Sequence, residues 1–115
     1  MSESPLTITV QSMARVDLMT VNGRIDSATA PELDAKLNET MGNGRYQIVM
    51  DLAQTSYMSS AGLRALVAAL RECKKHNGDV RLAAPSDRVA EVLDLAGLDS
   101  LFQTYDDALT AVGSF

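Results

Sequence analysis

The chain has 115 residues, of which 46% are hydrophobic and 22% are charged, and its formal net charge is −5. A chain of this length can bury a core of its own, so we expect one domain, residues 1–115, that folds without a metal or a disulfide. The acidic balance argues against nucleic acid as the main partner, because duplex binding depends on clustered lysine and arginine.

The sequence contains no apolar run near the roughly 20 residues of a membrane span, and its polar start, Met1–Pro5, is unlike a signal peptide. We therefore expect a cytoplasmic protein with no direct membrane insertion. The single cysteine, Cys73, cannot form an internal disulfide and falls on the apolar side of a predicted helix. We interpret it as a core residue rather than a reactive thiol.

The chain begins with a predicted hairpin. Leu6–Val10 alternates apolar and polar residues, which is typical of a half-exposed strand, and Val16–Val21 is its expected partner across a turn at Gln11–Arg15. Asn22–Gly23 is expected to end the second strand, and Arg24–Asp26 to form a short extended piece before the first helix.

The first helix is predicted from a Thr-x-x-Glu capping box. Thr29 and Glu32 occupy the two positions of the box and Pro31 falls inside the first turn, so the helix should begin near Ala30 and close at Gly42–Gly44. Its expected inward residues are Ala30, Leu33, Leu37 and Met41.

A central strand, a polar loop and a long helix follow. Tyr46–Leu52 is almost continuously apolar with β-branched residues, which predicts a strand buried on both faces. Residues 53–60 form the loop. Apolar residues then recur at three- and four-residue steps, which predicts a helix that packs on the sheet and ends where Gly78 adopts a left-handed conformation. These apolar residues are Leu63, Leu66, Val67, Leu70 and Cys73.

The remaining chain repeats the alternation of strand and helix. Val80–Ala84 is a predicted strand, Ser86 a predicted cap and Gly97 a helix stop, followed by a short extended piece at Leu101–Tyr105 and a helix over Asp106–Val112. The helix before Gly97 should turn four residues inward, Val89, Val92, Leu93 and Ala96. Together the elements predict an α/β domain whose sheet is mixed, because the opening hairpin adds an antiparallel edge.

Two adjacent serines stand at the start of the central helix. Unpaired N–H groups and the positive end of the helix dipole favour an oxygen or an anion there, and either Ser59 or Ser60 could be the N-cap. Only one can cap, so the other hydroxyl is left for another role. The absent side chain of Gly62 is expected to leave the first turn open to an approaching partner.

The usual catalytic constellations are missing from the sequence. The single histidine, His76, lies at the other end of the predicted helix from Ser60, roughly 24 Å away at ~1.5 Å per residue. We find no Gly-x-Ser-x-Gly elbow, no phosphate-binding glycine loop and no Cys/His metal spacing. We therefore expect no enzyme activity, no catalytic residues, no cofactor and no metal.

At these residues the sequence resembles a known family. The segment from Asp51 to Leu66 resembles the signature of STAS domains, in particular those of bacterial anti-sigma factor antagonists. Gly23–Ala30 and Ser86–Leu98 are also similar to the family, so the resemblance covers nearly the whole chain. It implies a single STAS domain, residues 1–115, with a mixed four- or five-stranded β-sheet packed with about four α-helices.

The resemblance also implies a site. Ser60 matches the position of the family's phosphoacceptor serine, while antagonists often carry aspartate where this chain has Ser59, so Ser59 is kept as an alternative acceptor. Asp26 belongs to a loop that lies close to the phosphoacceptor in the family, whereas Asp51 is expected to bond nearby backbone N–H groups. The expected partner-binding residues are Asp26, Tyr57, Met58, Ser59, Ser60, Ala61, Gly62 and Arg64.

The implied function is regulation of transcription by partner switching. The partner would be an anti-sigma factor with a histidine-kinase-like ATPase fold, a serine kinase that binds this chain while Ser60 is unphosphorylated and thereby releases a sigma factor. A serine phosphatase would restore the serine. The alternative is a STAS subunit that is a structural or regulatory component of a membrane transport complex of the ABC type.

Spacing adds an expectation about the same helix. Arg64, four residues after Ser60, could pair with a phosphate on that serine. Arg64, Ala68, Arg71 and Lys75 form a basic stripe that faces solvent, which is either simply solvated or a contact strip for an acidic partner. Because no long exposed apolar stripe is predicted, we expect a monomer.

Overall fold

The computed structural model describes residues 6–115, so the polar start at residues 1–5 lies outside the described residues. The strands are β1 (Leu6–Ser12), β2 (Asp17–Ile25), β3 (Gln47–Asp51), β4 (Thr55–Met58), β5 (Asp79–Ala83) and β6 (Thr104–Tyr105). The helices are α1 (Ala30–Gly42), α2 (Ser60–Lys75), α3 (Asp87–Leu95) and α4 (Ala108–Gly113).

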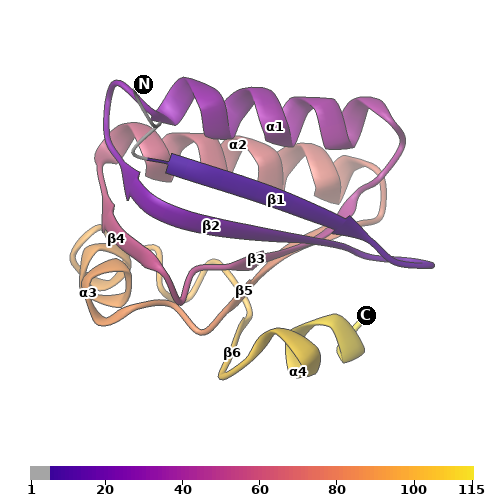
Figure 1. Cartoon of the computed structure of the whole chain (residues 1–115). Coiled ribbons are helices and arrows are strands. Elements are labelled where there is room, and N and C mark those ends of the chain that lie inside the picture. The colour runs from indigo at the N-terminus through magenta and orange to yellow at the C-terminus, as the bar shows by residue number, and fades with distance from the viewer. Residues whose placement is uncertain (1–5) are drawn as a thin grey trace.

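The strands form one mixed sheet in the order β1-β2-β3-β5-β6 (Figure 1). β1 and β2 are antiparallel, as predicted for the opening hairpin, and the other pairs are parallel. This confirms the predicted α/β class with a mixed sheet and four helices. With the two short strands β4 and β6, the described sheet has six strands. β4 lies within the segment that was expected to be a polar loop.

The second strand is longer than the sequence predicts. Asn22 and Gly23 do not end β2, which continues to Ile25. The first part of β2 pairs with β3, and its last residues pair in parallel with β4, which supplies the hydrogen bonds that keep the chain extended. Gly23 has a φ of 115° where the pairing with β4 shifts register, so the glycine serves a bulge rather than a turn.

The main core lies between the sheet and the two long helices. Figure 1 shows α1 and α2 side by side over one face of the sheet, with α4 below β3 and β5 on the other. Ile48 and Met50 of β3 face the first layer, while Val49 packs with Ala83 and Ala111 in a smaller core under α4. The prediction that the central strand is buried on both faces is therefore confirmed.

Most predicted inward residues are buried. In α1 these are Ala30, Leu33, Leu37 and Met41, and in α3 they are Val89 and Leu93. Ala96 is exposed, contrary to prediction, because α3 ends at Leu95 and Ala96 is only its C-cap.

The predicted capping box at Thr29 is wrong, although α1 does begin at Ala30. The Thr29 side chain makes no capping hydrogen bond to the helix. Its hydroxyl instead donates to the Arg24 carbonyl at 2.7 Å and accepts from the Asp26 N–H at 2.9 Å. The threonine therefore braces the turn that joins β2 to α1.

The end of α2 also differs from the prediction. Asn77 adopts the left-handed conformation, with a φ of 62°, and Gly78 does not. Gly78 is needed for a different reason, because a Cβ there would lie 1.8 Å from the carbonyl oxygen of Tyr46. Asparagine tolerates the left-handed region better than most residues, which leaves the glycine free for this close approach.

Candidate functional site

The two serines at the start of α2 have different roles. Ser59 is the N-cap: its backbone is extended, and its Oγ accepts a hydrogen bond from the Gly62 N–H at 3.4 Å. Ser60 is the first helical residue and is exposed, and its hydroxyl makes no hydrogen bond with any of residues 6–115. The free hydroxyl at this helix start therefore belongs to Ser60.

The start of α2 is fixed to the end of β2. Ile25 pairs with Met58 across the parallel strands, and the Ser59 N–H donates to the Ile25 carbonyl at 2.8 Å. Asp26 and Ser60 follow directly after these joined residues. The turn that contains Asp26 and the start of α2 thus lie at the same end of the sheet.

Asp26 presents a fixed carboxylate beside this helix start. One of its oxygens accepts hydrogen bonds from the N–H groups of Ala28 and Thr29, both at 3.0 Å, and from the Thr29 hydroxyl at 3.2 Å. These bonds, the one from the Thr29 N–H above all, together with the charge of Arg24, hold the pKa of Asp26 below its ordinary value. The side chain is 31% exposed, so a negative charge is available to a partner.

Arg24 and Tyr57 form a second surface feature of the site. They are partners across β2 and β4, and the Arg24 guanidinium lies over the Tyr57 ring, 5.0 Å from its centre. Arg24 also lies 3.9 Å from the Asp26 carboxylate. Sequence analysis missed Arg24 as a site residue, because only the pairing of two distant segments brings it to Tyr57.

Two of the expected partner-binding residues are buried. A Cβ on Gly62 would lie 2.6 Å from the Ile25 side chain and 3.1 Å from that of Met58. Gly62 therefore allows α2 to pack closely on β2, and the expectation that it opens the first turn to a partner is wrong. Met58 is 1% exposed, so it cannot contact a partner directly either. Among the other expected residues, Ser60 and Arg64 are exposed, while Asp26, Tyr57, Ser59 and Ala61 are partly exposed.

The segment before α2 is held rigidly. Asp51 accepts a hydrogen bond from the Ala53 N–H at 3.1 Å, as predicted for a carboxylate at the end of a buried strand. Thr55 is fully buried, and its hydroxyl donates to the Val21 carbonyl at 2.9 Å. The hydroxyl of Ser86 donates to the Thr55 carbonyl at 2.5 Å. These contacts make the predicted loop a fixed support for the serines.

The other end of α2 carries no part of this site. His76 is the C-cap residue, and its ring stacks on Tyr46 with centres 3.9 Å apart and planes 8° from parallel. The histidine also contacts Glu72 at 3.2 Å. It is exposed, and it lies at the opposite end of α2 from Ser60, as predicted.

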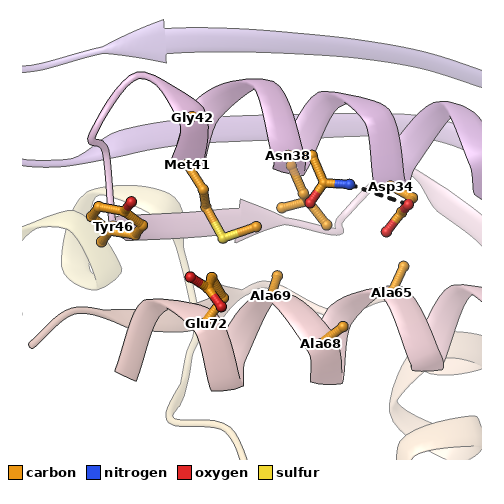
Figure 2. Close-up of a pocket in the computed structure, with 10 residues that line it drawn as sticks. Asp34, Asn38, Met41, Gly42, Tyr46, Ala65, Ala68, Ala69 and Glu72 are labelled. Carbon is orange, nitrogen blue, oxygen red and sulfur yellow. Dashed lines mark hydrogen bonds between the residues drawn. The ribbon is translucent and has the colours of Figure 1, made fainter. Parts of the chain in front are cut away.

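A groove of about 390 Å³ runs between α1 and α2, away from the serines. Figure 2 shows Asp34, Asn38 and Met41 of α1 facing three alanines of α2, with the Asn38 amide donating to Asp34. The groove includes neither serine and has acidic side chains, Asp34 and Glu72, on its two walls. Nothing in it resembles the arrangement around Ser60.

Residues 6–115 contain no group of three His, Cys, Asp or Glu side chains placed to hold a metal ion. Within the same range, none of the helices has the length and apolar character needed to cross a bilayer.

The family model named STAS domain matches residues 7–111 of this chain. The chain belongs to the STAS domain family. Among STAS relatives, BtrV of Bordetella bronchiseptica, named as a candidate anti-sigma factor antagonist, is 29% identical over 107 residues, covering 90% of this chain and 92% of the relative. The anti-sigma-B factor antagonist of Staphylococcus epidermidis is 31% identical over 81 residues, covering 70% of this chain and 75% of the relative.

Solved STAS structures agree with the fold. The anti-sigma factor antagonist SpoIIAA in its unphosphorylated form superposes with a TM-score of 0.81 and 20% identity, covering 92% of this chain and 93% of that chain. The phosphorylated form of SpoIIAA from Bacillus gives a TM-score of 0.75 and 19% identity, covering 94% and 98%. At this identity the likeness establishes the shared fold.

Proposed function

We propose that this chain is an anti-sigma factor antagonist and that phosphorylation of Ser60 controls its binding to an anti-sigma factor. The partner is an anti-sigma factor with a histidine-kinase-like ATPase fold, which is also the serine kinase, and a serine phosphatase reverses the modification. Binding of the unphosphorylated chain releases a sigma factor in the cytoplasm. The names of the STAS relatives support the partner class.

The observation that carries this proposal is the division of roles between the two serines. Because Ser59 caps α2, the hydroxyl of Ser60 is exposed and has no structural partner among residues 6–115. A phosphate on Ser60 would add about −1.5 to −2 charge at neutral pH. It would lie at the positive end of the α2 dipole, which favours an anion, so the fold tolerates the modification.

Phosphorylation would change the surface that a partner meets. The fixed carboxylate of Asp26 already gives this surface one negative charge. A partner site fitted to that charge and to a neutral serine would be repelled by the phosphate, and each ~1.4 kcal/mol of repulsion and desolvation weakens binding tenfold. A penalty of about 4 kcal/mol corresponds to roughly a thousandfold loss of affinity.

Arg64 is the proposed counter-charge for the phosphate. It lies one helical turn after Ser60, is exposed, and makes no ion pair with the described residues. Arg24, by contrast, is already held by Asp26 and Tyr57. Pairing of Arg64 with the phosphate would stabilise the modified form without involving the residues that fix the loop.

Substitution of Ser60 tests the proposed function. An anti-sigma factor recovered with Ser60→Ala as bait should bind this variant as it binds the unmodified chain and should bind Ser60→Asp at least tenfold more weakly, which calorimetry measures. With ATP, the same partner should add a single phosphate, a gain of about 80 Da, to the natural chain and none to Ser60→Ala.

Ser59→Ala is the matched control. It should keep the phosphate gain while losing about 1 kcal/mol of stability with the helix cap. Phosphate found only on Ser59, or equal binding by Ser60→Ala and Ser60→Asp, would contradict the proposal. A chain that accepts no phosphate and stays in a membrane transport complex would favour the structural-subunit alternative instead.

A further inference from the structure

A second groove lies along α2 beside the α1–α2 groove, and the two share Ala68. It has a volume of about 460 Å³ and is lined by Leu63, Arg64, Val67, Ala68, Arg71 and Leu98. Its floor is apolar: Leu63 is buried, and Val67 and Leu98 are partly buried and pack against the main core. Its rim is cationic, because Arg64 and Arg71 are both exposed.

The two arginines of the rim have no charged partner within residues 6–115. Within residues 6–115 the other lysines and arginines are paired, except Arg15 in the turn between β1 and β2, which does not line the groove. Arg45 and Arg81 contact buried aspartates at 2.6 and 3.0 Å, and Lys75 lies 3.8 Å from Glu72. Arg64 and Arg71 are about two helical turns apart, or roughly 10 Å along the axis. On a chain of net charge −5, this pair of unpaired cations over an apolar floor is complementary to an acidic, apolar ligand.

Two exposed leucines lie close to Leu98 in the sequence. The segment 95–101, which supplies Leu98 to the groove, also exposes Leu95 at 80% and Leu101 at 47%. These are two of the three large hydrophobic side chains that the described residues leave exposed. Exposed leucines gathered on one short segment beside a groove are typical of an interaction surface.

We infer that this groove between α2 and Leu98 binds an acidic amphipathic helix of the anti-sigma factor. The inference rests on the proposed function and adds a second contact to it. Apolar side chains of the partner helix would fill the floor, and two carboxylates about two turns apart would meet Arg64 and Arg71. The α1–α2 groove is unsuited to the same ligand, because Asp34 and Glu72 line it.

The groove would give affinity and partner selection that do not depend on Ser60 itself. Only Arg64 is shared by the groove and the phosphate site, so Arg71 and Val67 are the residues that separate the two contacts. Related anti-sigma factors that all recognise an exposed serine would then be distinguished by the charge of the helix they offer to this groove.

A pair of charge reversals on α2 tests the inference. Arg71→Glu should weaken binding of the unphosphorylated chain to the purified anti-sigma factor at least tenfold, measured by calorimetry at low salt. Lys75→Glu makes the same charge change one turn further on, outside the groove, and should weaken binding less than threefold. Circular dichroism should show both variants folded, because both side chains are exposed.

The outcomes separate this inference from the proposed function. If the unsubstituted chain fails to bind any anti-sigma factor, the proposed function fails and the groove with it. If it binds and Arg71→Glu behaves like Lys75→Glu, the groove inference alone is wrong.

A photo-crosslinking residue identifies what occupies the groove. Placed at Val67, which is partly exposed and lines this groove but not the α1–α2 groove, it should capture an acidic helical peptide of the anti-sigma factor, identified by mass spectrometry. The same residue at Ala35, exposed on α1, should capture none of that peptide. Capture of a second copy of this chain at position 67, or of a basic peptide, would overturn the inference.

Discussion

Gly62 lies where a side chain would collide with β2. A methyl group there would lie 2.6 Å from the Cγ2 atom of Ile25. Ile25 is branched and fully buried in the core, so it has little room to move away. We expect Gly62→Ala to lower the free energy of unfolding by about 1–3 kcal/mol, the usual cost of overpacking. Urea denaturation measures the change.

Gly42→Ala is the control for this substitution, because a Cβ at Gly42 meets nothing within 4 Å. It should leave stability within about 1 kcal/mol of the natural chain, on the stabilising side if the helix propensity of alanine is realised. Equal effects of the two substitutions would show that the packing of α2 on Ile25 is looser than the structure has it.

Asp26 gives stability a defined pH dependence. Hydrogen bonds from Thr29 and Ala28 hold its pKa below the ordinary value of an aspartate, so the folded state favours the ionised form. The resulting stabilisation is fully present above the unfolded pKa and is lost as the pH falls through the folded pKa.

Comparison with Asp26→Asn isolates this effect. The natural chain should be more stable than the variant at pH 7, and the difference should disappear once the pH falls below both the unfolded and the folded pKa of Asp26. Asp107, whose pKa is also lowered by hydrogen bonding to Thr110, titrates in both proteins and cancels in the difference. A difference that stays constant with pH would assign the role of Asp26 to geometry alone.

At the scale of elements, local patterns predicted most of the fold. The apolar run of β3, the three- and four-residue steps of α2 and the serine cap of α3 each depend on neighbouring residues in the chain. The Ser86 hydroxyl accepts from the Val89 N–H, as its position predicted. Such features are readable from sequence because short segments determine them.

The elements that sequence analysis missed depend on contacts between distant segments. β4 forms because the end of β2 is available to pair with it. Thr29 does not cap α1 because its hydroxyl bonds to the Arg24 carbonyl and the Asp26 N–H instead. A glycine is needed at position 78, but the reason is the close approach of the Tyr46 carbonyl, which lies just before β3. The residues of one segment alone do not predict contacts with a distant segment.

The candidate site could be predicted in outline only. The sequence indicated that one of the two serines caps α2, and the structure assigns the cap to Ser59. Met58 and Gly62 look like neighbours of Ser60 in sequence, yet both turn into the core. Arg24 was missed because its contact with Tyr57 crosses two strands far apart in the chain.

At the scale of the whole molecule, the sheet separates two cores of unequal size. α4 covers the smaller core, and Arg81 binds the C-terminal residues that follow this helix. Its guanidinium contacts Asp79 at 3.0 Å, donates to the Ser114 carbonyl at 2.7 Å and lies 4.0 Å from the centre of the Phe115 ring. The C-terminal residues are therefore part of the folded structure rather than an appendage.

Cys73 lies in the larger core and can report on unfolding of the whole molecule. Burial, together with the charges of Asp79 and Glu72, raises the pKa of its thiol to about 11, and the side chain is fully inaccessible. We expect Ellman's reagent at pH 8 to react very slowly with the folded chain and to titrate one thiol once urea unfolds it.

The rate of thiol labelling in increasing urea should follow the unfolding transition seen by circular dichroism. This is expected because Cys73 is buried in the main core and becomes accessible when the whole domain unfolds. Fast stoichiometric labelling in buffer would show that the helix detaches from the sheet without global unfolding.

The joining of β2 to β4 has a consequence for when the site exists. Residues 24–26 and 57–60 are distant in sequence and are brought together by this parallel pairing, by the bond from Ser59 to Ile25 and by the contact of Arg24 with Tyr57. In a nascent or denatured chain Ser60 is one hydroxyl on a flexible peptide, with no carboxylate beside it. A kinase that recognises Asp26 and Ser60 together would therefore phosphorylate only folded chains. The phosphorylated molecules would then all be correctly folded.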